Sequence, residues 1–127
     1  MKQTVATDKA PKAIGPYSQA VKSGGFLFLS GQIPLDPATG ELVPGDIRAQ
    51  AGRVMENIAA VLEEAGAGFD SIVKSTIFLT DLGNFAAVNE VYGSYFEAAP
   101  PARSTVEVKG LPRAALVEIE VVVAVTP

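Results

Sequence analysis

The chain has 127 residues, of which 48% are hydrophobic, so we expect residues 1–127 to form a single domain with a substantial core. It contains no Cys and no His, which excludes disulfides, thiolate nucleophiles and imidazole acid–base catalysis. Because zinc and copper sites normally use these ligands, a zinc or copper enzyme is disfavoured. We therefore expect no metal and no cofactor. The net charge of −4 disfavours nucleic-acid partners. No apolar run reaches the ~18 residues of a membrane span, and no signal peptide is evident. We therefore expect a cytoplasmic protein without membrane contacts.

The first third of the sequence predicts a short strand followed by a β-hairpin. Residues 4–7 suit an edge strand, and the Gly-Pro pair within residues 14–18 indicates a loop. Residues 19–22 and 26–30 flank two consecutive glycines, which is a hairpin signal. The second hairpin strand leads directly into a turn at Gly31, where exposed backbone amides could bind an anion or a carbonyl group.

Two helices are predicted, with one strand between them. Asp46 suits the N-cap of a long helix in which apolar residues recur at helical spacing, and Gly66 ends it. Residues 71–79 are rich in β-branched side chains and predict a strand. The second helix is capped by Asp81 or Asn84. Pro100 and Pro101 are expected to end this helix. Its inward-facing residues are Phe85, Val88, Tyr92, Tyr95 and Phe96.

The last part of the chain predicts two strands, residues 103–108 and 116–125, joined by a turn with Gly110 and Pro112. Side chains in a strand alternate between two faces. One face of the last strand is wholly apolar, and the other carries Leu116, Glu118, Glu120, Val122 and Ala124. In the preceding strand, Arg103, Thr105 and Glu107 share a face. If these two strands pair, an arginine and two acids occupy one surface.

The order of elements indicates an α/β or α+β layer, a mixed sheet with two helices packed on one face. The other face would then present Leu116, Val122 and Ala124 beside the two glutamates. A face of this apolar character typically meets another subunit.

The charged residues of the last two strands are the strongest functional candidates. The planar guanidinium of Arg103 suits bidentate contact with a carboxylate; the alternative is a structural ion pair with a nearby glutamate. Glu118 and Glu120 could include one acid whose pKa is raised by its like-charged neighbour and by apolar walls, which would suit acid–base chemistry without histidine. They could also be two solvated acids on a sheet face.

Four further residues are weaker candidates. Asn89 lies among aromatic residues of the second helix and must find hydrogen-bond partners, either by supporting a loop or by contacting a ligand. Ser30 has no histidine base, so a nucleophilic triad is excluded. Tyr17, in the Gly-Pro loop, could cover a site or donate a hydrogen bond. Gly93, inside the second helix, suggests close packing.

Five segments along nearly the whole chain form a recognisable series. They are residues 13–20 around Tyr17, Ser30-Gly31-Gln32-Ile33-Pro34, Val88-Asn89, Pro101-Ala102-Arg103-Ser104 and Glu118-Ile119-Glu120. In this order and spacing they resemble the Rid family, the reactive-intermediate imine/enamine deaminases that are also called YjgF-like proteins.

The resemblance implies a chorismate-mutase-like fold and a homotrimer, with the sheets forming a barrel-like centre, the helices outside and three clefts between neighbouring subunits. It also implies a 2-iminobutanoate/2-iminopropanoate deaminase, which hydrolyses small imine and enamine acids of the 2-aminoacrylate and 2-aminocrotonate type to 2-oxo acids and ammonia. Two alternatives remain, a non-catalytic trimeric binder of small 2-oxo acids or amino-acid intermediates, and a translation-inhibiting or ribonuclease-type role.

The same resemblance assigns roles to individual residues. Arg103 corresponds to the residue that holds the substrate carboxylate, and Glu118 to the acid that activates or orients water. The residues that correspond to other positions in the cleft are Tyr17, Ser30, Gly31, Asn89 and Thr105. Several relatives have Cys where this chain has Thr105, so regulation through that thiol is not available here. The implied mechanism places water, steered by Glu118, on the imine carbon, after which ammonia leaves.

Overall fold

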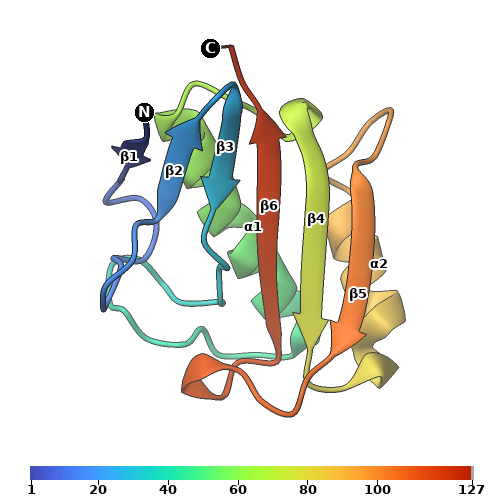
Figure 1. Ribbon diagram of the computed structural model, residues 1–127. Helices are drawn as coiled ribbons and strands as arrows, with labels where there is room; N and C mark the ends of the chain where they lie inside the picture. The colour runs from blue at the N-terminus through green and yellow to red at the C-terminus, as the bar shows by residue number, and fades with distance from the viewer. Residues whose placement is uncertain (127) are drawn as a thin grey trace.

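Six strands form one mixed sheet in the computed structural model, which describes residues 1–126. The strands are β1 (Gln3–Val5), β2 (Ala20–Ser23), β3 (Phe26–Leu29), β4 (Ile72–Leu79), β5 (Ala102–Glu107) and β6 (Val117–Ala124), and the helices are α1 (Ile47–Glu64) and α2 (Phe85–Gly93). The strand order is β1-β2-β3-β6-β4-β5 (Figure 1). Only the β4–β5 pair is parallel among these neighbours.

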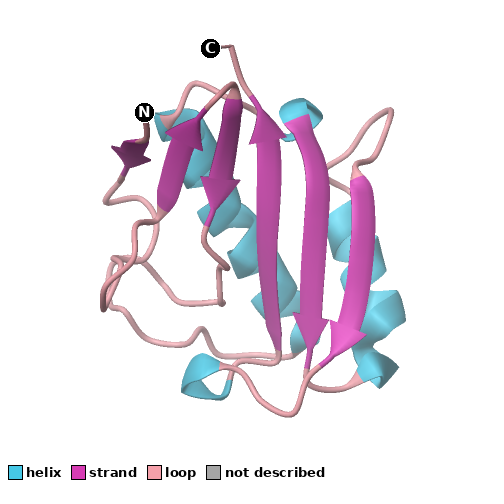
Figure 2. Ribbon diagram, viewed as in Figure 1, coloured by secondary structure: helices cyan, strands magenta, loops and turns pink. Residues whose placement is uncertain are grey.

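Both helices lie on the same face of the sheet (Figure 2), which confirms the predicted α+β arrangement. The core lies between the two layers, where alternate residues of β6 meet the apolar stripe of α1. These core residues include Val117, Ile119, Val121 and Val123 from the strand and Val54, Ile58, Val61 and Leu62 from the helix. Within residues 1–126, neither helix has the length and hydropathy needed to cross a bilayer.

The local signals for the hairpin and the first helix are confirmed. Strands β2 and β3 pair as an antiparallel hairpin, and both turn glycines, Gly24 and Gly25, have positive φ, which glycine adopts without steric cost. Helix α1 begins after Asp46, whose carboxylate accepts a hydrogen bond from Ala49 N at 3.1 Å. Gly66, at φ +74°, follows its C-terminus.

The second helix is shorter than predicted. Asp81 caps the 3₁₀ turn η2 (Leu82–Asn84), and α2 then ends at Gly93, well before the two prolines that were expected to end it. Tyr95 and Phe96 therefore lie beyond the helix and pack their rings against Phe69, with centroids 5.0 and 5.8 Å away. This aromatic packing holds the segment after α2 against Phe69.

The predicted pairing of the last two strands is wrong, because β4 lies between β5 and β6. Helix α2 connects β4 to β5 as the crossover that a parallel pair requires, which fixes β5 at one edge of β4. Strand β6 pairs antiparallel with the other edge of β4. The connection with Gly110 and Pro112 therefore passes β4 to reach β6, and it does not form a β-hairpin between β5 and β6.

The register across β4 also places the predicted site residues on opposite faces of the sheet. Arg103 pairs with Ser75, a fully buried residue on the helix-covered side. Glu118 pairs with Phe78, one of the β4 residues on the open side. Because side chains alternate along each strand, Arg103 faces the helix layer and Glu118 the uncovered face. The single surface expected to hold both residues does not exist in this chain.

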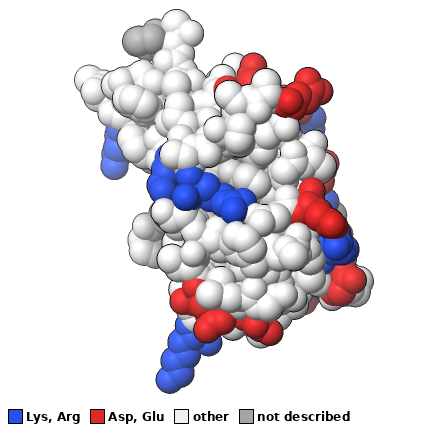
Figure 3. Space-filling view, turned by 90° about the vertical axis from the view of Figure 1, so that its right-hand side faces the viewer, with Lys and Arg blue, Asp and Glu red and all other residues white. Residues whose placement is uncertain are grey.

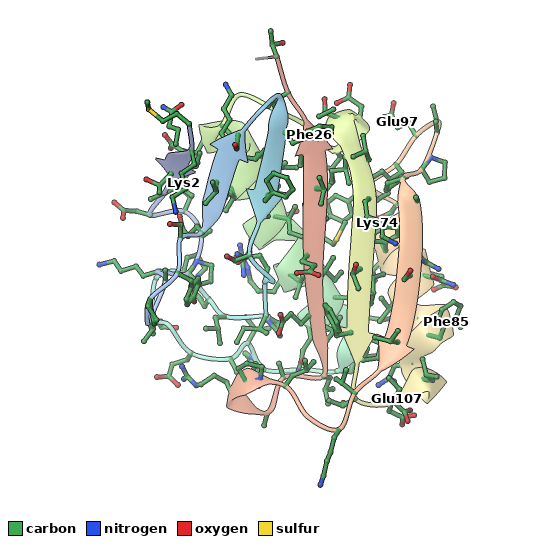
Figure 4. All side chains as sticks on the ribbon, in the orientation of Figure 1. Lys2, Phe26, Lys74, Phe85, Glu97 and Glu107 are labelled. Atoms are coloured by element: carbon green, nitrogen blue, oxygen red, sulfur yellow. The ribbon has the colours of Figure 1, made fainter. Side chains whose placement is uncertain are left out.

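The uncovered face carries apolar side chains beside the two glutamates, as the sequence predicted. Besides the residues of β6, it carries Phe26, Phe28 and Val106, each more than 40% exposed. Figure 4 shows the sheet from this side, with Phe26 labelled near β3 and Lys74 on β4. An exposed apolar sheet of this extent is typical of a surface that meets another protein surface.

Buried amide side chains tie the loops to the helix layer. Asn57, fully buried on α1, donates from Nδ2 to the carbonyl oxygens of Ile33 (3.3 Å) and Leu35 (3.0 Å). Gln50, also on α1, accepts a hydrogen bond from Leu116 N at 2.9 Å, just before β6. The loop that follows β3 and the start of β6 are thus both fixed by α1.

Replacing Asn57 with Ala should destabilise the protein by about 1–3 kcal/mol, because two backbone carbonyls lose their partner inside the protein. Urea unfolding of wild type and variant measures this difference. Asn84→Ala is the control, since the Asn84 side chain makes no capping hydrogen bond, and it should change stability by less than about 0.5 kcal/mol. Equal effects of the two substitutions would contradict the role given to Asn57.

Candidate functional site

The guanidinium of Arg103 is held by one face of α2. Its Nη1 donates to Asn89 Oδ1 at 2.7 Å, and its Cζ lies 5.5 Å from the ring centroid of Phe85 and 5.2 Å from that of Tyr92. Residues 85, 89 and 92 fall on one side of a helix because they are four and three positions apart. We call Arg103, Asn89, Phe85, Tyr92 and Thr105 the arginine site.

The charge of Arg103 is not neutralised by a neighbouring acid. Within residues 1–126, no carboxylate lies within 4.0 Å of its guanidinium, so the expected ion-pair alternative does not apply. Glu107, on the same face of β5, instead accepts a hydrogen bond from Leu82 N at 2.9 Å. The nearby hydroxyl Oγ1 of Thr105 is buried and has no hydrogen-bond partner among the described residues. A guanidinium without an acidic partner suits an anionic ligand.

Figure 3 looks at the edge of the molecule formed by β5 and α2. A basic patch crosses the middle of this face, and acidic side chains lie around it. Lys74, on β4, contributes a second cation near this edge, since its Nζ donates to Ser104 Oγ on β5 at 3.0 Å. The edge is therefore locally positive although the whole chain carries a net charge of −4.

Glu118 forms a second cluster at the opposite side of the sheet. Gln32 and Ile119 exchange two backbone hydrogen bonds, Gln32 N to Ile119 O at 2.8 Å and Ile119 N to Gln32 O at 3.1 Å, which bring the loop after β3 against β6. The Glu118 side chain then lies directly over Gly31. A Cβ atom at Gly31 would be 2.8 Å from Glu118 Cδ and closer still to Oε2. We call Glu118 and Gly31 the glutamate site.

Burial, and to a smaller extent the negative charge of Glu120, raises the pKa of the Glu118 carboxyl above its ordinary value. The hypothesis of one acid with a raised pKa is therefore confirmed for Glu118, with burial as the larger cause. Glu120, two residues further along the same face, is exposed. Of the two acids, Glu118 is thus the one suited to exchange a proton nearer to neutral pH.

Ser30 and Tyr17 lie next to the glutamate site. Ser30 Oγ donates to Ser18 O at 2.6 Å and so ties the end of β3 to the Gly-Pro loop. Tyr17, in that loop, is 52% exposed. It lines a cavity of about 260 Å³ together with Gly31, Pro112 and Arg113. Ser30 therefore has a structural contact, and Tyr17 shares a cavity with Gly31 of the glutamate site.

The arginine site and the glutamate site do not meet within one chain. Strand β5 is two strands away from β6, roughly 10 Å across the sheet, and the two side chains project from opposite faces. The residues that the sequence placed in one cleft thus divide into Arg103, Asn89 and Thr105 on one side and Glu118, Gly31, Ser30 and Tyr17 on the other.

Sequence reasoning missed the part played by Phe85 and Tyr92, which it assigned only to the inward stripe of α2. Both rings contact the guanidinium of Arg103. Their spacing of seven residues, with Asn89 between them, was the available signal.

The close packing predicted at Gly93 is wrong, because a Cβ atom there would have no neighbour within 4 Å. Among the described residues, no group of three or more carboxylates is arranged to hold a metal ion.

The sequence and the fold match a known family. The family model described as Endoribonuclease L-PSP matches residues 7–125. Protein DfrA of Myxococcus xanthus is 62% identical over 123 residues, which cover 95% of this chain and 94% of DfrA. The mouse 2-iminobutanoate/2-iminopropanoate deaminase is 42% identical over 127 residues, which cover 100% of this chain and 94% of the mouse protein. The crystal structure of E. coli TdcF with bound serine has a TM-score of 0.93 and 43% identity, covering 98% of this chain and 99% of TdcF. The chain belongs to the Rid (YjgF-like) family and has its chorismate-mutase-like fold.

Replacing Gly31 with Ala should displace the Glu118 carboxylate, because the new methyl group occupies its position. The side chain is flexible at its far end, so the change in stability should stay below about 1 kcal/mol. The pKa of Glu118, followed by NMR of the carboxyl carbon, should move toward its ordinary value as the group leaves its partly buried position. Gly52→Ala, in α1 with no neighbour near the added methyl, should leave this pKa unchanged; an unchanged pKa in Gly31→Ala would contradict the close packing.

The raised pKa of Glu118 predicts how stability depends on pH. An acid whose pKa is higher in the folded state binds more protons when folded, so it costs stability once pH rises above its ordinary value of 4.5. Glu118→Gln should remove this cost. The free energy of unfolding of the variant relative to wild type should therefore increase as pH rises from 4.5 toward neutrality. Glu63→Gln, an exposed site on α1, should show a smaller pH-dependent difference.

Proposed function

We propose that this protein hydrolyses small 2-imino and 2-enamino acids, of the 2-aminocrotonate and 2-aminoacrylate type, to 2-oxo acids and ammonia. The observation that carries the proposal is Arg103, a half-buried guanidinium held in place by α2 without an acidic partner. Such a group suits the carboxylate that all these substrates share. The name of the mouse relative and the serine bound to TdcF, an amino acid of similar size, support the same substrate class.

Glu118 is the group that would move protons in this reaction. An enamino acid first tautomerises to the imine by moving a proton from nitrogen to carbon. Hydrolysis then adds water to the imine carbon, breaks the carbon–nitrogen bond and releases ammonia, so the protons of the water must leave its oxygen and reach the nitrogen. A carboxyl group with a raised pKa can do both, as base and then as acid. The chain has no His or Cys to take this role.

A second copy of the chain would bring the two halves of the site together. Because the arginine site and the glutamate site lie on opposite sides of one sheet, a contact in which one protomer's arginine site faces the next protomer's glutamate site would complete a cleft. Such a head-to-tail contact closes into a ring when the rotation between successive protomers permits it. The open face with Phe26, Phe28 and Val106 would be covered in such an assembly. Among closed rings we propose the homotrimer with three clefts between subunits, which is the assembly that the family resemblance implies.

Two other functions would use the same surfaces differently. A non-catalytic binder of 2-oxo acids would need Arg103 but not the proton transfer by Glu118. A ribonuclease-type role is suggested by the description of the family model, but the net charge of −4 and the absence of His disfavour it.

The decisive experiment combines activity and subunit mixing. Threonine dehydratase and threonine supply 2-aminocrotonate, and the release of 2-oxobutanoate is followed with and without this protein. Wild type should accelerate release. Arg103→Lys, which loses the planar fork, and Glu118→Gln, which cannot exchange a proton, should each lose roughly tenfold to a hundredfold in kcat/KM. Glu120→Gln is the matched control and should lose less.

The two weakened variants, unfolded together in equal amounts and refolded, should recover activity. In a ring whose clefts take Arg103 from one subunit and Glu118 from the next, about one quarter of the clefts contain both native residues. A mixture no more active than its components would contradict a site shared between subunits. Normal turnover by Arg103→Lys alone would instead contradict the carboxylate contact.

A further inference from the structure

The tyrosine that contacts Arg103 is itself anchored in the core. Tyr92 is 5% exposed, and its hydroxyl donates to Ser75 Oγ at 2.8 Å. Ser75 is the residue paired with Arg103 across the β4–β5 ladder. The hydroxyl end of the Tyr92 ring is thus fixed at Ser75, next to the backbone of Arg103. The face of the same ring lies under the guanidinium.

We propose that Tyr92, anchored by Ser75, is a positioning residue that aims the guanidinium of Arg103 at the substrate carboxylate. The inference rests on the proposed function, in which Arg103 binds that carboxylate. It adds a role to Tyr92, which the sequence assigned only to the inward face of the second helix, and to Ser75, which the sequence did not single out.

Aromatic contacts suit this task because they hold a cation without using its hydrogen-bond donors. A guanidinium has five N–H donors in a fixed fork. An acidic partner would occupy two of them and cancel the charge, whereas the rings of Phe85 and Tyr92 attract the charge through their faces. Asn89 takes a single hydrogen bond from Nη1. The remaining donors stay available for a planar carboxylate that approaches edge-on.

Fixing the side chain before the ligand arrives also lowers the entropic cost of binding. A free arginine side chain carries about 2 kcal/mol of rotamer entropy, which a ligand must otherwise overcome. Burial raises the pKa of Tyr92, so the hydroxyl stays protonated and keeps its hydrogen bond to Ser75. The ring therefore keeps one orientation under the guanidinium.

The first test compares Tyr92→Leu with Phe96→Leu. Phe96 packs on Tyr92, with ring centroids 4.8 Å apart, but makes no contact of this kind with Arg103, so its replacement matches the loss of aromatic packing. Binding of 2-oxobutanoate and of uncharged 2-oxobutanamide is measured by calorimetry. Tyr92→Leu should weaken binding of the acid by roughly threefold to thirtyfold and leave amide binding unchanged. Phe96→Leu should leave both unchanged. Equal loss for acid and amide, or equal loss in both variants, overturns the inference.

A second comparison separates positioning from stability. Tyr92→Phe leaves the buried Ser75 hydroxyl without a partner and should lower stability, whereas Ser75→Ala with Tyr92→Phe removes both partners and should recover much of it. If the anchor positions the ring, 2-oxobutanoate binding stays weakened in the double variant although stability returns. Binding that returns together with stability overturns the inference.

Failure of the inference is distinguishable from failure of the proposed function. If Arg103→Lys weakens binding of 2-oxobutanoate but Tyr92→Leu does not, only the positioning role is wrong. If wild type does not bind 2-oxobutanoate, or Arg103→Lys binds it normally, the carboxylate contact itself is wrong and the inference falls with it.

Discussion

The position of β4 between β5 and β6 is the constraint on which the rest of this structure depends. The α2 crossover makes β5 parallel to β4 and leaves it at the sheet edge, where α2 covers only one side of it. Arg103 can therefore lie under α2 and still be reached from outside. Strand β4 thus separates Arg103 from Glu118 by the thickness of the sheet and by two strand spacings. One protomer presents two separate candidate sites, and this geometry connects the proposed chemistry to the proposed assembly.

The two charged groups are kept reactive by different means. Arg103 retains its charge and most of its donors because aromatic rings and one amide oxygen hold it, with no acid nearby among the described residues. Glu118 is pressed over the backbone of Gly31, where a side chain at position 31 would leave it no room. Loss of water around the carboxylate then raises its pKa. In the proposed function, the first group binds the substrate carboxylate and the second exchanges protons.

Local sequence signals predicted most of the elements, because hairpin glycines, helix caps and alternating apolar residues act over a few neighbouring positions. The hairpin of β2 and β3, the start of α1 at Asp46 and the faces of β5 and β6 all follow from such signals. The end of α2 did not. The rings of Tyr95 and Phe96 pack on Phe69, which is distant in sequence, and this contact outweighs the local helical pattern.

For the candidate site, the sequence by itself determined which residue types carry chemistry and, through the family resemblance, which positions they hold. In a chain without His or Cys, charged groups remain for acid–base chemistry and anion binding, and the family resemblance selects Arg103 and Glu118 as candidates. Only the tertiary structure decided that they face opposite ways, because strand order and register depend on non-local hydrogen bonds that no short segment encodes. It also decided that Tyr92 contacts Arg103 and that Glu118 lies over Gly31, since the first contact depends on how α2 packs beside β5 and the second joins residues far apart along the chain.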